Sequence, residues 1–207
     1  MNVYANNATW QNVSIPNVCT FKIPDTMEIQ AGKYKIISDG LQKEIFELPV
    51  DSTRVIAQQK GLNKYSKEAF KEKNYARVMI ETDYGQNGDY ENIRTPLTAT
   101  AFELNELSML YRDEIVKVFT QLSAKGKIKQ KLLAWYPLKI VNINGISMIK
   151  VSYQRSVNNA KPVLVNIYVV NNNDRLHRIT VSYKIENAVN YKNDLDKVIE
   201  TFTFVQQ

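Results

Sequence analysis

Residues 132–184 contain two pairs of alternating β-strands, and the tight turn within each pair constrains the fold strongly. The stretch "LLAWYPLKIVNINGISMIKVSYQRS" predicts two strands joined at Asn144-Gly145, a residue pair that favours a two-residue hairpin turn. The stretch "KPVLVNIYVVNNNDRLHRITVSYK" predicts a second pair that turns at "NNND". Strands that follow one another through such short turns run antiparallel. The sequence therefore predicts a mainly antiparallel sheet.

Two amphipathic helices are indicated by apolar residues that recur at three- and four-residue steps. Thr100 and Glu103 have the spacing of a capping box and mark the start of the first helix, which ends at Gly126. Its apolar stripe consists of Leu104, Leu107, Tyr111, Ile115, Val118 and Leu122. The second stripe consists of Tyr191, Leu195, Val198, Ile199 and Phe202. Because each stripe must be buried against strands, we expect an α+β fold, a layered α/β/α sandwich with a mainly antiparallel sheet.

The rest of the chain adds strands to one domain. Residues 1–17 are expected to form an N-terminal tail or edge segment, and residues 18–207 a single α+β domain. Alternation and charge predict strands through Phe21–Ile23 and Met27–Ile29, a core strand at Val55 and Ile56, a short charged helix around Phe70, and a strand from Tyr75 to Thr82. In the last of these, Val78 and Ile80 share one face, and Arg77, Met79 and Glu81 share the other.

The composition is typical of a folded globular protein, with 44% hydrophobic and 23% charged residues. The longest apolar run is a few residues, whereas a membrane-spanning helix needs about 18, so no transmembrane segment is expected. The N-terminus lacks the charged start and apolar core of a signal peptide. Val3 and Ala5 are small residues of the kind that precede a cleavage site. Two readings stay open: an exported protein that has lost its leader, or a cytoplasmic protein with a polar tail.

Catalytic patterns are absent from the sequence. His177, the single histidine, shares a strand face with Ile179 and Val181, so we expect a structural side chain. Cys19, the single cysteine, has apolar and hydroxylated neighbours and is expected to be a buried, inert thiol. The chain has no glycine-rich phosphate loop, nucleophile elbow or zinc-binding helix motif. No catalytic, cofactor-binding or metal-binding residue is therefore assigned.

The loop "DYGQNGDYENIR" partly matches a calcium-binding loop. Asp83, Asn87 and Asp89 occupy ligand positions, but Gly85 stands at the third position and Arg94 replaces the final bidentate acid. An Asn- and Gly-rich loop after a strand explains the same residues without a metal. Whether the Asp83–Asp89 loop binds a cation stays open.

The formal net charge is +6, and the densest group of lysines is Lys125, Lys127, Lys129 and Lys131. Such a cluster between a helix and a strand is usually a solvated turn. Nucleic-acid binding would be better supported by interleaved aromatic residues or a known module, and the sequence shows neither. Nucleic acid is thus disfavoured as a partner.

Three stretches resemble the PsbP-like fold family, which includes the extrinsic photosystem II protein PsbP and a Ran-binding nuclear-import factor. They are "FKIPDTMEI", "NGISMIKVSYQR" and "DRLHRITVSYKIENAVNYKNDLDKVIETFTF", and the resemblance covers roughly residues 18 to 207. It implies a PsbP-like α+β sandwich in a bacterial protein. Members of this fold are mostly binders or scaffolds, so it also implies a non-enzymatic role, with no site residue carried over.

The resulting hypothesis is a non-enzymatic binding or accessory module for a protein or peptide, with no cofactor. Its predicted partner contacts are Trp10, Tyr84, Tyr90, Lys125, Lys127 and Lys129. One alternative is an enzyme whose site is assembled from dispersed acids, tyrosines and lysines. Another is an anion or nucleic-acid binder that uses the Lys125–Lys131 cluster. The sequence leaves the oligomeric state open.

Overall fold

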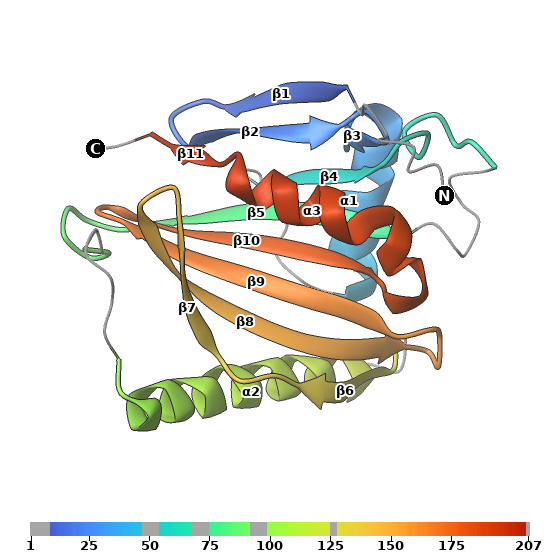
Figure 1. Ribbon diagram of the computed structural model, residues 1–207. Helices are drawn as coiled ribbons and strands as arrows, with labels where there is room; N and C mark the ends of the chain where they lie inside the picture. Colours follow the sequence, from blue (N-terminus) through green and yellow to red (C-terminus); the bar gives the residue numbers. More distant parts are fainter. Residues whose placement is uncertain (1–8, 47–53, 68–74, 92–98, 125–127, 206–207) are drawn as a thin grey trace, which may run out of the picture.

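A large antiparallel sheet forms the middle layer of the molecule (Figure 1). Helix α3 and a small second sheet cover one face, and helix α2 lies beneath the other. The structure is a computed structural model that describes residues 9–46, 54–67, 75–91, 99–124 and 128–205. This arrangement confirms the predicted α+β sandwich with its mainly antiparallel sheet.

Within the described ranges, the large sheet has eight strands in the order β3-β4-β5-β10-β9-β8-β6, and β7 also pairs with β8. Their bounds are β3 Met27–Ile29, β4 Val55–Gln59, β5 Ala76–Tyr84, β6 Gln130–Trp135, β7 Lys139–Ile143, β8 Ile146–Val157, β9 Val163–Asn172 and β10 Arg175–Lys184. All of these pairings are antiparallel. The small sheet has the order β1-β2-β11, with β1 Trp10–Ile15, β2 Cys19–Pro24 and β11 Thr203–Phe204.

The predicted turns explain the sheet order. Asn144 and Gly145 both have positive φ, at 54° and 78°, and they join β7 to β8 in the expected two-residue hairpin. Asn173, with a φ of 61°, lies in the turn between β9 and β10. The strand expected before Asn144 is divided into β6 and β7, with Pro137 between them. Proline has no backbone N–H to donate, which is why the strand breaks there.

The described residues form three α-helices beside the sheets: α1 Gly32–Phe46, α2 Ala101–Ala124 and α3 Ala188–Glu200, the last preceded by the short 3-10 helix η1 Ile185–Asn187. The capping box of α2 is formed, because the Thr100 amide donates to Glu103 Oε2 at 2.8 Å and the Glu103 amide donates to Thr100 Oγ1 at 3.2 Å. Helix α1 was not predicted. Its sequence carries Ile36, Ile37 and Gly40, residue types that disfavour a helix.

The main core lies between the large sheet, α3 and the small sheet. From α3, Leu195, Val198 and Ile199 are buried, as the second predicted stripe requires. They belong to the same core cluster as Val78 and Ile80, from the apolar face of β5. Cys19 is fully buried in this core, and burial raises the pKa of its thiol to about 12. The thiol is therefore protonated at neutral pH.

Some predictions fall outside the described residues. These are the helix around Phe70 and the helix end at Gly126, together with Lys125 and Lys127. Within the described ranges, no helix is both long enough and apolar enough to span a membrane.

Candidate functional site

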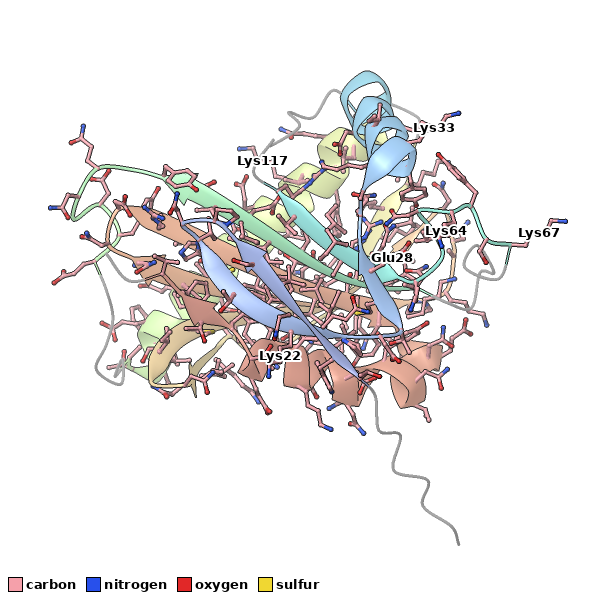
Figure 2. The ribbon with its side chains drawn as sticks, turned by 90° about the horizontal axis from the view of Figure 1, so that it is seen from above. Lys22, Glu28, Lys33, Lys64, Lys67 and Lys117 are labelled. Carbon is pink, nitrogen blue, oxygen red and sulfur yellow. The ribbon has the colours of Figure 1, made fainter. Side chains whose placement is uncertain are left out.

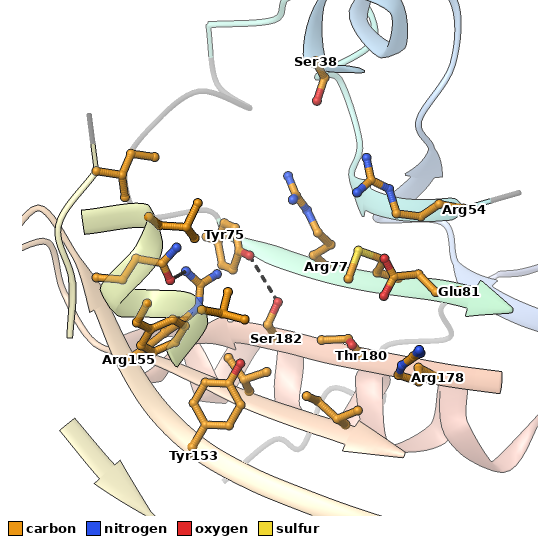
Figure 3. A pocket seen from close by; sticks show the side chains of 18 residues that line it. Ser38, Arg54, Tyr75, Arg77, Glu81, Tyr153, Arg155, Arg178, Thr180 and Ser182 are labelled. Carbon is orange, nitrogen blue, oxygen red and sulfur yellow. Dashed lines mark hydrogen bonds between the residues drawn. The ribbon is translucent and has the colours of Figure 1, made fainter. Parts of the chain in front are cut away.

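A cavity of about 590 Å³ lies between the large sheet and the C-terminal half of α2 (Figure 3). Strands β5, β8, β9 and β10 supply one side, and α2 supplies an apolar wall opposite. Ser38 of α1 and Arg54, which precedes β4, also line it. The cavity is on the sheet face that does not contact α3, so it is separate from the main core.

Strand alternation places polar side chains in this cavity. On β5, Val78 and Ile80 are buried in the main core, whereas Arg77 and Glu81 point to the opposite face and line the cavity. Strand β10 follows the same rule. Its cavity-lining residues are Arg178, Thr180 and Ser182.

Arginine dominates the charge of the lining. Among the described residues, four arginines line the cavity, namely Arg54, Arg77, Arg155 and Arg178, against the single carboxylate of Glu81. The guanidinium group of arginine keeps its positive charge in proteins. The lining therefore carries an excess of positive charge.

Two of these arginines have acidic partners near the rim. Arg54 Nη2 lies 3.5 Å from Asp39 Oδ1. Arg178 binds the carboxylate of Asp83, with Nη1 donating to Oδ2 at 2.7 Å. Their charge is thus partly neutralised by the protein itself.

Arg77 and Arg155 are different. Within the described part of the chain, neither has a carboxylate within ion-pair distance. Arg155 Nη1 donates to the neutral Gln130 Oε1 at 3.0 Å. The Nε of Arg77 is buried and has no hydrogen-bond partner among the described residues. A buried donor without an acceptor is costly, so this position favours an acceptor that arrives with a ligand.

Tyr75 lies next to these two arginines. Its hydroxyl is hydrogen-bonded to the Ser182 hydroxyl at 3.2 Å, and the Arg77 guanidinium carbon is 5.8 Å from its ring centroid (Figure 3). Burial raises the pKa of Tyr75, but the charges of Arg77 and Arg155 and the hydrogen bonds from Ser182 and Arg155 outweigh it. The net pKa is below the usual value of 10. The site therefore stabilises negative charge.

The opposite wall is apolar. Val118, Phe119 and Leu122 of α2 line the cavity, and the Phe119 ring meets the Tyr153 ring edge-on at 6.1 Å. Val118 and Leu122 belong to the predicted inner stripe of α2. That stripe is half-buried, whereas Phe119 beside it is buried in a second core cluster with Tyr153, Val163 and Val165 of the sheet.

Helix α2 is fixed to the sheet beside the cavity. The indole Nε1 of Trp135 on β6 donates to Ser108 Oγ at 2.9 Å, and the Trp135 ring stacks on Tyr153 at 6.0 Å. Burial raises the pKa of Tyr153, so its hydroxyl stays protonated and can donate a hydrogen bond. The cavity thus combines cationic and neutral donors with an apolar wall.

This combination suits an anion better than a metal ion. Guanidinium groups bind carboxylates and phosphates through two parallel hydrogen bonds and repel cations. Among the described residues, no cluster of three or more His, Cys, Asp or Glu side chains could hold a metal.

The residues predicted as partner contacts lie elsewhere. Trp10 is half-buried on β1 and packs against the main core. Tyr84, at the end of β5, is 54% exposed and lies under the Arg175 guanidinium at 5.2 Å. Tyr90 is half-buried and bridges to Asn173, and Lys129 is exposed before β6. Their role as partner contacts stays a prediction.

The carboxylates of the Asp83–Asp89 loop are used within the protein. Asp83 binds Arg178, and Asp89 Oδ2 accepts a hydrogen bond from the Gln86 amide at 2.6 Å. Asn173 Oδ1 accepts another from the Gly88 amide at 3.1 Å. These contacts shape the loop around the β9–β10 turn.

His177 lies on the other face of β10, away from the cavity. It is fully buried, with Nδ1 3.0 Å from Thr82 Oγ1 and Nε2 3.3 Å from Asn172 Nδ2. Its ring also stacks on Phe204 at 4.7 Å. These contacts describe the structural side chain that was expected.

Sequence reasoning missed the arginine cavity. The alternation of Arg77, Met79 and Glu81 on β5 is visible in the sequence, but by itself it indicates only the more polar face of a strand. A central strand covered on both faces is normally apolar. Arginine on such a face could have indicated a cavity, had the position of α2 been known.

Comparison with solved structures finds proteins that this chain resembles in structure. Cyanobacterial PsbP (CyanoP) from Synechocystis sp. PCC 6803 matches with a TM-score of 0.53 and 12% identity, over 99% of this chain and 98% of that one. PA94, a protein of unknown function from Pseudomonas aeruginosa, matches with a TM-score of 0.42 and 12% identity, over 96% of this chain and 97% of that one. LpqN of Mycobacterium tuberculosis, involved in cell envelope biogenesis, matches with a TM-score of 0.39 and 11% identity, over 97% of this chain and 92% of that one.

No protein-family model matches the sequence, and no curated protein matches it significantly. The likeness to CyanoP is structural and extends over nearly the whole of both chains. On that likeness, this chain has a PsbP-like fold.

Proposed function

We propose that this chain is a non-enzymatic binding module whose cavity holds a small organic anion with an apolar part. The observation that carries the proposal is the pair Arg77 and Arg155, which lie without carboxylate partners among the described residues, opposite the apolar wall of α2. A carboxylate or phosphate would supply the missing negative charge. Val118 and Leu122 would contact the apolar part.

The size of the cavity supports a small ligand. Its volume of about 590 Å³ lies within the range of roughly 300–1,000 Å³ that is usual for small-molecule sites. A peptide would have to enter by a short acidic segment or a terminal carboxylate. On this proposal, a protein or peptide partner would be recognised through the acidic group that enters the cavity.

Replacement of Arg77 by glutamine tests the charge contribution. The probe is anilinonaphthalene sulfonate, an aromatic anion that fluoresces when bound, and its uncharged relative is phenylnaphthylamine. Because a hydrogen bond to a charged group contributes about 1.5–3 kcal/mol, Arg77→Gln should weaken sulfonate binding at least about tenfold. Binding of phenylnaphthylamine should hardly change. Fluorescence titration measures both affinities.

The matched control is Arg112→Gln, because Arg112 is exposed on α2 and does not line the cavity. It removes the same charge and should leave both affinities unchanged. Circular dichroism checks that each variant is folded. Equal sulfonate affinity for wild type and Arg77→Gln, or an equal loss in Arg112→Gln, would contradict the proposal.

A second candidate is an enzyme that uses Tyr75 as a general base on an anionic substrate, because the Tyr75 hydroxyl is hydrogen-bonded to Ser182 in the cavity and its pKa is lowered. A ligand recovered from the cavity would then be converted by the wild-type protein and left unchanged by Tyr75→Phe. Mass spectrometry of the incubated ligand measures the conversion. Recovery of the unchanged ligand after incubation with wild-type protein excludes this candidate.

A further inference from the structure

The N-terminal part of α1 and the loop after β4 form a surface of lysines and exposed isoleucines, here named the α1 surface. It consists of Lys33, Ile36 and Ile37 on α1, and Lys64 and Lys67 on the loop. Lys33, Lys64 and Lys67 lie on the same side of the molecule (Figure 2). Lys22 and Lys117 lie on other sides. The α1 surface is distant in sequence from the lysine cluster at Lys125–Lys131.

Defined contacts hold the two segments of this surface together. The Tyr34 and Tyr65 rings meet edge-on, with centroids 5.8 Å apart. Asn63 Oδ1 accepts a hydrogen bond from the Ala31 amide at 3.1 Å, and Asn63 Nδ2 donates to the Ile29 carbonyl at 2.7 Å. The lysines of the loop are therefore held beside the first turns of α1.

The isoleucines are unusually open to water. Ile36 is 73% exposed and Ile37 43% exposed, and both are three to four residues from Lys33, on the same side of the helix. All three lysines are exposed as well. Apolar side chains interspersed with lysines gain free energy when they enter a layer of anionic headgroups and acyl chains.

We infer that the α1 surface binds anionic lipid at the surface of a membrane. Lysine ammonium groups near such a surface are attracted by the headgroup phosphates, while Ile36 and Ile37 enter the boundary with the acyl chains. An acidic protein is the competing partner. Protein interfaces usually have an apolar centre depleted in lysine and a polar rim, whereas here Lys33 lies on the same side of α1 as both exposed isoleucines.

Vesicle sedimentation tests the inference, using phosphatidylcholine vesicles with and without phosphatidylglycerol. Wild-type protein should bind the vesicles that contain phosphatidylglycerol, and added salt should release it. The triple variant Lys33→Glu, Lys64→Glu and Lys67→Glu should bind at least about tenfold more weakly. The variant Ile36→Ser keeps all charges and should bind at least about threefold more weakly.

The matched control is Lys22→Glu, Lys117→Glu and Lys197→Glu, which alters the net charge of +6 by the same amount at exposed positions elsewhere. It should keep most of the vesicle binding. Circular dichroism and urea unfolding of each variant show that the fold is intact. An equal loss in both triple variants would reduce the effect to general charge attraction and overturn the inference. So would capture by immobilised polyglutamate without binding to any vesicle, which would indicate an acidic protein partner.

Discussion

Phe202→Ala is expected to lower the free energy of unfolding by about 4 kcal/mol. The Phe202 side chain is 1% exposed, and its ring lies parallel to that of Phe21 at 4.5 Å. It also stacks on Phe204 at 6.0 Å, so it contacts the central strand β2 and the outer strand β11 of the small sheet. Truncation leaves a hole between rigid strands that cannot collapse to fill it. Urea unfolding followed by circular dichroism measures the change.

The control for this prediction is Val189→Ala on the neighbouring helix α3. Val189 is 93% exposed, so its truncation should alter stability by less than about 0.5 kcal/mol. A loss below about 1 kcal/mol for Phe202→Ala would show that the stacked rings contribute little, and would contradict the packing described for the main core.

The stability of the protein should also fall as the pH is lowered from about 6.5 to 4. Burial lowers the pKa of His177 from 6.5 to about 4, with a further decrease from Arg175 and partial opposition from Asp174. The folded state therefore resists protonation, whereas the unfolded state binds the proton near pH 6.5. Over that window the linked loss is roughly 3 kcal/mol. Urea unfolding at a series of pH values measures it.

His177→Asn separates this effect from the titration of carboxylates. Asparagine cannot be protonated in this range, so the stability of the variant should depend less on pH, by roughly the 3 kcal/mol assigned to His177. The geometry gives the reason. Asn172 Nδ2 donates toward Nε2, so that nitrogen must accept and cannot carry a proton. Parallel pH profiles for the two proteins would show that His177 is not the linked group.

Much of the fold could be predicted because its signals are local. The Asn144-Gly145 turn, the capping box of α2 and the buried stripe of α3 each depend on residues close in sequence, and the structure confirms all three. Helix α1 could not be predicted, since its isoleucines are exposed and Gly40 lies within it. The pairing of β11 with β2 was missed for another reason. It joins residues about 180 positions apart, and no local pattern encodes it.

The candidate site could not be predicted in the same way. Tyr75, Arg77 and Arg155 come together only because β5, β10, β9 and β8 are neighbours in the sheet and α2 crosses their shared face. In the sequence each arginine is an ordinary polar residue of an alternating strand. The two arginines indicate an anion site only because they line one cavity, and that cavity depends on the tertiary structure.

The small sheet constrains the order in which the strands can pair during synthesis. Strand β2 pairs with β1 soon after both leave the ribosome, but its other edge must wait for Thr203–Phe204 and for the Val205 amide that donates to the Val18 carbonyl. The hairpins from β7 to β10 can assemble earlier, because their partners are adjacent along the chain. Until Thr203–Phe204 has been synthesised, β2 has one unpaired edge, whose backbone groups can pair with strands of neighbouring nascent chains.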